Sequence, residues 1–127
     1  MERLFADPEC WEFKNKFPDE FKSYGCGPGG IGDILVPDTV YFLSIRDACR
    51  IHDWGYRHSP GCSEEDRARH DRILLNNSIR IVTGQTYFNI IRMLRYRRCR
   101  TYYQMVRAFG GPAYWDERNP ENTIGVV

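Results

Sequence analysis

The chain has 127 residues, of which 42% are hydrophobic and 28% charged, and its formal net charge is +1. This length and apolar content predict one compact domain spanning residues 1–127. The small net charge excludes a global attraction to nucleic acid or membrane, so any such attraction must come from a local patch. We expect no transmembrane segment and no secretory signal, because no stretch has the apolar length that either requires.

The first segment, residues 1–23, mixes aromatic side chains with acids and lysines. Phe13, Phe17 and Phe21 recur at helical spacing, but Pro18 lies inside the pattern and would interrupt a helix. We therefore expect short helical pieces, with the aromatic rings in the core.

The next segment is a glycine-rich stretch with five glycines between Gly25 and Gly32. Such density rules out a regular helix or strand. It would let the carbonyls of Gly25, Gly27 and Gly29 turn toward one point, as a calcium ion requires. A phosphate cradle is the competing use, although the Gly-x-x-x-x-Gly-Lys-Ser/Thr pattern is absent. A plain flexible turn is the third alternative.

Residues 43–58 read as the first long helix, with Ser44 as a candidate cap, and they contain the motif His-Asp-x-x-Tyr. Residues at i, i+3, i+4 and i+7 share one face of a helix. Four chemically capable side chains have this spacing: Cys49, His52, Asp53 and Tyr56. A buried His beside a surface Asp is the alternative interpretation of the pair.

A second helix is predicted to open at Ser63, after a tight connection, and to end at Thr83–Gly84. Helices joined by so short a link pack antiparallel. His52 precedes the turn by six residues and Asp71 follows it by eight. At 1.5 Å per residue their heights differ by about 3 Å, so Asp71 is expected to face His52. Asp53, about 100° around the helix, would point to the glycine-rich stretch.

Residues 86–109 form a third, basic helix in this prediction. Its charge comes from Arg92, Arg95, Arg97, Arg98, Arg100 and Arg107. Such a run is usually a solvated face, and the functional alternative is contact with an anionic membrane through Arg92, Arg95 and Arg98. Nucleic acid is not expected, because no recognised binding motif accompanies the charge. The tail, residues 116–127, is expected to be loosely ordered.

The five cysteines are too few for a disulfide-built scaffold, and their odd number leaves at least one thiol without an internal partner. The core must therefore be mostly hydrophobic. One or two bridges would suit an extracellular or virion-associated protein, which we favour, whereas none would suit the cytoplasm.

Together these features resemble the secretory phospholipase A2 superfamily over residues 24–80. Residues 26–30, Cys-Gly-Pro-Gly-Gly, are similar to its calcium loop, and residues 49–56, Cys-Arg-Ile-His-Asp-Trp-Gly-Tyr, to its active-site helix. The scarcity of cysteines and the tight turn at residues 59–62 bring the chain closest to the phospholipase domain of parvovirus capsids. Residues 70–74 and 103–115 also resemble small phage-encoded proteins of unknown activity.

The resemblance implies a mainly α, phospholipase A2-like fold and a calcium-dependent hydrolase that cleaves the sn-2 ester of glycerophospholipids. His52 would activate water, Asp71 and Tyr56 would support it, and the Gly27 amide would stabilise the oxyanion. The implied calcium ligands are Gly25, Gly27, Gly29 and Asp53. The resemblance also implies a Cys26–Cys49 disulfide.

Two rival functions remain. One is a non-catalytic lipid- or partner-binding module on the same fold, with His52 and Asp71 as a buried polar pair. The other is a structural zinc protein that uses Cys26, Cys49, His52 or His70, although the chain has no Cys-x-x-Cys pair.

Overall fold

The computed structural model describes residues 3–25 and 37–118. This part of the chain is mainly α, as expected, with a small antiparallel sheet. Its helices are α1 (Pro8–Lys16), α2 (Pro18–Ser23), α3 (Arg46–His58), α4 (Glu64–Gln85), α5 (Asn89–Phe109) and α6 (Gly111–Asp116). Its strands are β1 (Thr39–Val40) and β2 (Leu43–Ser44), which pair Thr39 with Ser44 and Val40 with Leu43.

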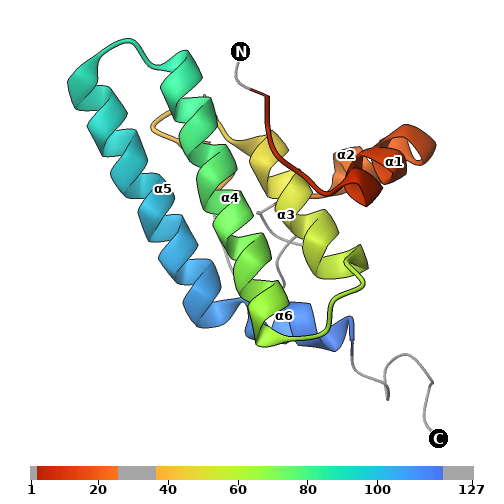
Figure 1. Ribbon diagram of the computed structural model, residues 1–127. Coiled ribbons are helices and arrows are strands. Elements are labelled where there is room, and N and C mark those ends of the chain that lie inside the picture. Colours follow the sequence, from red (N-terminus) through yellow and green to blue (C-terminus); the bar gives the residue numbers. More distant parts are fainter. Residues whose placement is uncertain (1–2, 26–36, 119–127) are drawn as a thin grey trace, which may run out of the picture.

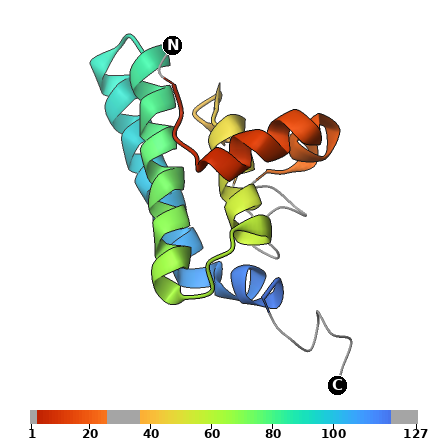
Figure 2. The ribbon, with the colours of Figure 1, turned by 45° about the vertical axis from the view of Figure 1, so that its right-hand side comes forward.

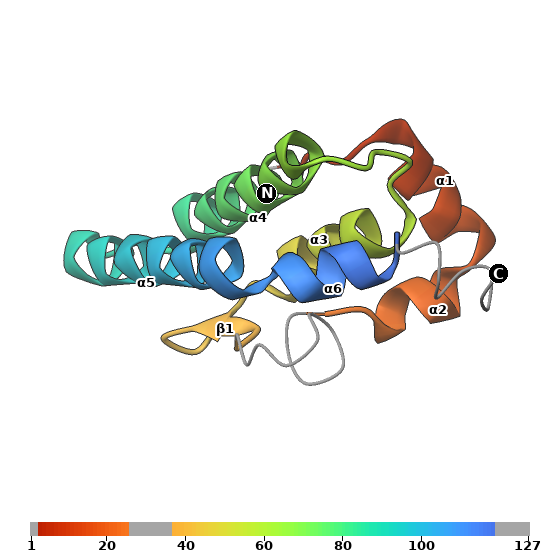
Figure 3. The same ribbon diagram turned by 90° about the horizontal axis from the view of Figure 1, so that it is seen from below.

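Helices α3, α4 and α5 lie side by side, with α4 packed against both of the others (Figure 1). Helices α1 and α2 lie beside α3, on the side away from α5 (Figure 2). Helix α6 crosses one end of the three long helices, next to α3 (Figure 3). The main core cluster is shared by the hairpin and helices α3 to α6.

Among the described helices, none combines the length and the apolar character needed to cross a bilayer.

The N-terminal segment forms two short helices, as the position of Pro18 predicts. Each begins with a proline in its first turn, where the missing N–H costs nothing. Phe21 is buried and Phe13 is partly buried, but Phe17 is exposed. The prediction that all three rings enter the core was therefore wrong for Phe17, which lies at the break between the helices.

The first long helix begins at Arg46, three residues later than predicted, because Leu43 and Ser44 form a strand. The turn of this hairpin places Tyr41 at φ 45° and Phe42 at φ 69°. Two-residue hairpin turns need positive φ at both central positions, where Gly and Asn are the usual residues. Because two aromatic residues occupy these positions, the sequence lacks the residues from which such a turn is predicted.

Helices α3 and α4 are joined by a short link, as predicted. The Ser63 Oγ accepts a hydrogen bond from the Asp66 N–H at 3.0 Å and so caps α4. The helix continues past Thr83–Gly84 to Gln85, so the predicted stop at Gly84 was one residue early.

The C-terminal segment is better ordered at its start than we expected. Asp116 ends α6, and the Arg118 side chain donates to the carbonyls of Gly55, Ser59 and Gly61 at 2.7–3.1 Å. These bonds satisfy carbonyls at the end of α3 and in the link that follows it. The remainder of the predicted tail, residues 119–127, lies outside the described residues.

The close approach of α3 and α4 depends on a glycine. A Cβ on Gly55 would lie 2.4 Å from Nδ1 and 2.7 Å from Cγ of the buried His70. No real Cβ tolerates such contacts, so the two helices would have to separate.

We predict that Gly55→Ala lowers the free energy of unfolding by about 1–3 kcal/mol, because overpacking outweighs the better helix propensity of alanine. Urea denaturation would measure the loss. Gly111→Ala is the matched control, because no atom lies within 4 Å of a Cβ there. Equal stability of the two variants would contradict the prediction.

Candidate functional site

The His-Asp-x-x-Tyr motif lies on the face of α3 that packs against α4. His52 and Asp71 are both fully buried, and the His52 Nε2 lies 2.7 Å from the Asp71 Oδ1. The contact that helix geometry predicted is therefore present. This contact determines that Nε2 is the ring nitrogen that faces the carboxylate.

Asp71 collects further hydrogen bonds from two other helices. The Tyr56 Oη donates to its Oδ1 at 2.6 Å, and the Arg107 guanidinium, from α5, donates to its Oδ2 at 2.8 Å. A second guanidinium, that of Arg67, lies 3.7 Å from the same oxygen. Tyr56 was predicted, whereas both arginines were missed. The i,i+4 spacing of Arg67 and Asp71 was a usable signal for one of them.

These partners decide the charge of Asp71. Burial alone raises the pKa of the carboxyl, but the bonds from His52, Tyr56 and Arg107 outweigh burial and hold the pKa below its usual value. Burial and the neighbouring carboxylate raise the pKa of Tyr56, so its hydroxyl stays a donor at neutral pH. The site therefore holds an ionised carboxylate against the imidazole.

The other ring nitrogen of His52 is unusual. Its Nδ1 is buried and has no hydrogen-bond partner among the described residues. With the carboxylate accepting the Nε2 proton, a neutral imidazole has its lone pair on Nδ1. The arrangement can therefore take up a proton at Nδ1 while Asp71 stabilises the resulting charge.

Asp53, the next residue, faces a different neighbour, as expected. The Gly25 N–H donates to its Oδ2 at 3.2 Å and the Arg57 Nε to its Oδ1 at 2.9 Å. Its carboxylate is thus brought to the start of the glycine-rich stretch. Of the other predicted calcium ligands, Gly27 and Gly29 lie outside the described residues.

Asp53 is a buried carboxylate whose two oxygens bond to Arg57 and Gly25. Only 1% of the residue is exposed, and burial raises the pKa of its carboxyl despite the opposing effects of Arg57 and Gly25. Carboxylate oxygens are among the ligands that calcium takes, but within residues 3–25 and 37–118 no group of three or more His, Cys, Asp or Glu side chains gathers to hold a metal.

The residues of the zinc alternative do not converge in the described part of the chain. In residues 3–25 and 37–118 no group of three or more His, Cys, Asp or Glu side chains is placed to hold a metal. His70 packs against Gly55 and the Trp54 ring.

Cys26 lies outside the described residues, so the Cys26–Cys49 disulfide stays a prediction. Three other thiols, Cys10, Cys62 and Cys99, are free.

The three arginines assigned to membrane contact all bond within the protein. Arg92 donates to the Thr86 carbonyl, and Arg95 to the Thr86 Oγ1 at 3.0 Å. Arg95 also donates to the Tyr41 carbonyl at 2.8 Å, and Arg98 to the Tyr41 Oη at 2.9 Å. They tie α5 to the hairpin and to the residue that follows α4.

Comparison of the chain with protein-family models, with curated proteins and with solved structures finds no match in any of the three. The resemblance to the secretory phospholipase A2 superfamily therefore stays a prediction that rests on the quoted motifs.

We predict that Arg107→Gln raises the pKa of Asp71 and lowers the free energy of unfolding at pH 7 by about 1–2 kcal/mol, because a charged hydrogen bond is lost. The depressed native pKa of Asp71 makes its contribution to stability present above the unfolded pKa of about 3.9, and that contribution is lost as pH falls through the native value. The variant should therefore lose this contribution at a higher pH.

Urea denaturation between pH 3 and pH 7 would measure both effects. Arg72→Gln is the control, because Arg72 adjoins Asp71 in sequence but is exposed. A variant whose deficit is the same at pH 3 and at pH 7 would show that Arg107 acts by packing alone.

Proposed function

We propose that the protein is a calcium-dependent, phospholipase A2-type hydrolase that cleaves the sn-2 ester of glycerophospholipids. The observation that carries the proposal is the buried His52, which has a carboxylate on Nε2 and an unpaired acceptor at Nδ1. The ester position and the lipid come from the family resemblance. The same proposal includes the phospholipase A2-like form of the mainly α fold, the Cys26–Cys49 disulfide, and an extracellular or virion-associated location.

In this mechanism His52 acts as a general base. Its Nδ1 takes a proton from the attacking water, and the Asp71 carboxylate stabilises the imidazolium that forms. Tyr56 and Arg107 hold the carboxylate in place through both of its oxygens. The imidazole then returns the proton to the leaving alcohol, so no covalent intermediate with the enzyme is needed.

Calcium would be held by Asp53 with the carbonyls of Gly25, Gly27 and Gly29, and when bound it supplies a Lewis acid for the ester carbonyl. The Gly27 amide would donate to the developing oxyanion. Of this set Gly25 and Asp53 are described, and they are brought together by the Gly25 N–H, which donates to the Asp53 Oδ2.

We expect His52→Gln to abolish fatty-acid release from mixed phospholipid vesicles in calcium, because glutamine cannot take up the proton. General-base catalysis is worth about 10²–10⁴-fold, so the loss should be at least about a hundredfold. His58→Gln is the control, because His58 ends the same helix, is exposed, and bonds to the Tyr24 hydroxyl.

Wild-type release should also stop when calcium is chelated. Full activity of His52→Gln, with a normal circular dichroism spectrum, would overturn the assignment of the base. Release that persists in chelator would overturn the calcium dependence.

A second prediction concerns the metal itself. Asp53→Asn should weaken calcium binding, measured by titration calorimetry, by at least about tenfold, because the site loses its charged ligand. Asp47→Asn is the matched control on α3, because Asp47 is exposed and pairs with Arg50 at 3.1 Å. Equal calcium affinity in both variants would exclude Asp53 as a ligand.

The complete burial of His52 favours a second candidate, a non-catalytic lipid- or partner-binding module. There His52 and Asp71 form a structural pair, and contact with an anionic membrane is made by the basic helix, for which Arg92, Arg95 and Arg98 were proposed. Salt-sensitive vesicle binding by a calcium-loaded protein, with no fatty-acid release, would favour this candidate over the hydrolase.

A further inference from the structure

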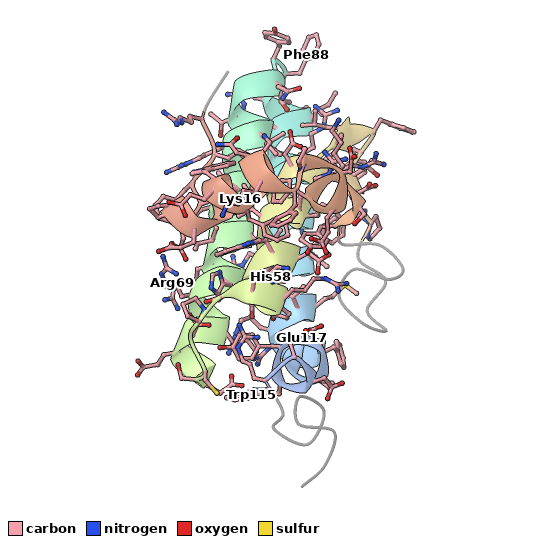
Figure 4. The ribbon with its side chains drawn as sticks, turned by 90° about the vertical axis from the view of Figure 1, so that its right-hand side faces the viewer. Lys16, His58, Arg69, Phe88, Trp115 and Glu117 are labelled. Carbon is pink, nitrogen blue, oxygen red and sulfur yellow. The ribbon has the colours of Figure 1, made fainter. Side chains whose placement is uncertain are left out.

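Large apolar side chains are exposed together at one end of the molecule. Tyr87 and Phe88, between α4 and α5, are 88% and 72% exposed, and Ile90 is 74% exposed. Figure 4 shows Phe88 at one end, with Trp115 and Glu117 at the other. We call this surface the apolar end and define it by six residues: Phe42, Tyr87, Phe88, Ile90, Ile91 and Leu94.

The hairpin, whose Tyr41 lines one groove with Leu94 of α5, adds a further exposed aromatic residue. Phe42 is 100% exposed and has a positive φ, a backbone conformation that a bulky side chain rarely adopts. The neighbouring Tyr41 is held by Arg95 and Arg98 of α5, and the Arg98 guanidinium lies 4.8 Å from the centre of its ring. The protein therefore fixes the hairpin in a strained conformation that leaves Phe42 in water. Strain of this kind marks functional sites.

The charge of α5 and of the turn before it has one sign, and Asp38, beside the hairpin, is paired with Arg46. Residues 72–115 contain no Asp or Glu, and their basic residues are Arg72, Arg80, Arg92, Arg95, Arg97, Arg98, Arg100 and Arg107. A groove of about 560 Å³ runs between the hairpin and α5, and Leu94, Arg97 and Arg98 help to line it. Arg97 is exposed. The groove therefore joins guanidinium groups to the apolar end.

We propose that the apolar end and this groove dock onto an anionic phospholipid bilayer. Phe42 and Phe88 enter the boundary between head groups and acyl chains, and Arg97 and Arg98 pair with lipid phosphates. The inference takes its partner, a phospholipid surface, from the proposed function and rests on it to that extent. Of the three arginines first assigned to membrane contact it keeps only Arg98, which is exposed although it bonds to Tyr41, and it adds Arg97.

Two other occupants fit the observations less well. A nucleic-acid duplex would pair with the arginines but would leave the exposed aliphatic and aromatic side chains in water, because its bases are already stacked. A second copy of the chain would bring two acid-free, arginine-rich surfaces together, and like charges repel. A bilayer satisfies the apolar and the basic groups at once.

The test is sedimentation with vesicles of phosphatidylcholine alone and of phosphatidylcholine with phosphatidylglycerol in equal parts, in chelator so that calcium-dependent hydrolysis cannot contribute. We expect binding to the anionic vesicles, and roughly fivefold or greater loss of affinity for Phe42→Ser and for Phe88→Ser. Phe109→Ser is the matched control, because Phe109 is 65% exposed at the far end of α5. It should bind as the wild type does.

The charge contribution has its own pair of variants. Arg97→Gln should weaken binding to anionic vesicles about fivefold, the usual effect of one basic residue at such a surface. Arg72→Gln changes the net charge equally, but Arg72 is exposed in the middle part of α4, 13 residues before its last residue, and it should have a smaller effect. Circular dichroism would confirm that each variant is folded.

Several outcomes would overturn the docking proposal. They are no binding to anionic vesicles, equal loss in the Phe88 and Phe109 variants, stronger binding to a DNA duplex than to vesicles, or a dimer that Phe42→Ser dissociates. Vesicle binding that persists in a protein without hydrolytic activity would support the docking face and refute only the hydrolase. Hydrolysis of a soluble short-chain ester without vesicle binding would support the hydrolase and refute only the docking face.

Discussion

The buried carboxylate of Asp71 is the constraint on which the three long helices depend. Asp71 belongs to α4, and it accepts hydrogen bonds from α3 through Tyr56 and from α5 through Arg107, with His52 at 2.7 Å. A charge taken out of water is stabilised only when its partners are well placed, and removal of one partner can cost several kcal/mol. Any shift of α3 or α5 relative to α4 would therefore lengthen these hydrogen bonds and leave the buried charge without its partners. One side chain thus links the geometry of the site to the packing of the helices.

Glycine at position 55 makes this geometry possible. Because it has no Cβ, His70 can lie against the backbone of α3, and the two helices approach closely enough for the His52–Asp71 contact. Arg118 then holds the end of α3 by bonding the carbonyls of Gly55 and Ser59. The chemistry of the site thus depends on Gly55, which has no side chain, and on Arg118, which lies far from α3 in the sequence.

What could be predicted from the sequence follows from how far each interaction reaches along the chain. The His52–Asp71 contact was predictable because two helices joined by a short link have a fixed register. Arg107 and Arg118 were not, because nothing local specifies where a third helix or a distant turn packs. The hairpin was missed for a different reason. Its turn residues, Tyr41 and Phe42, lack the glycine or asparagine that announces such a turn, and tertiary contacts with α5 hold it instead.

Several buried polar atoms of the described residues have no hydrogen-bond partner, and three of them, the Arg50 Nε, the His52 Nδ1 and the Trp54 Nε1, lie on α3. The Nδ1 of His52 is buried without a partner, and burial keeps the pKa of Asp53 raised despite its contacts with Arg57 and Gly25. Proteins rarely leave buried polar groups unsatisfied, and the exceptions gather where a proton or a ligand is to be received. What sets His52 apart from the other unsatisfied atoms is the ionised Asp71 on the opposite side of its ring, which would stabilise a proton taken up at Nδ1. This is the feature of the pair that the hydrolase proposal uses.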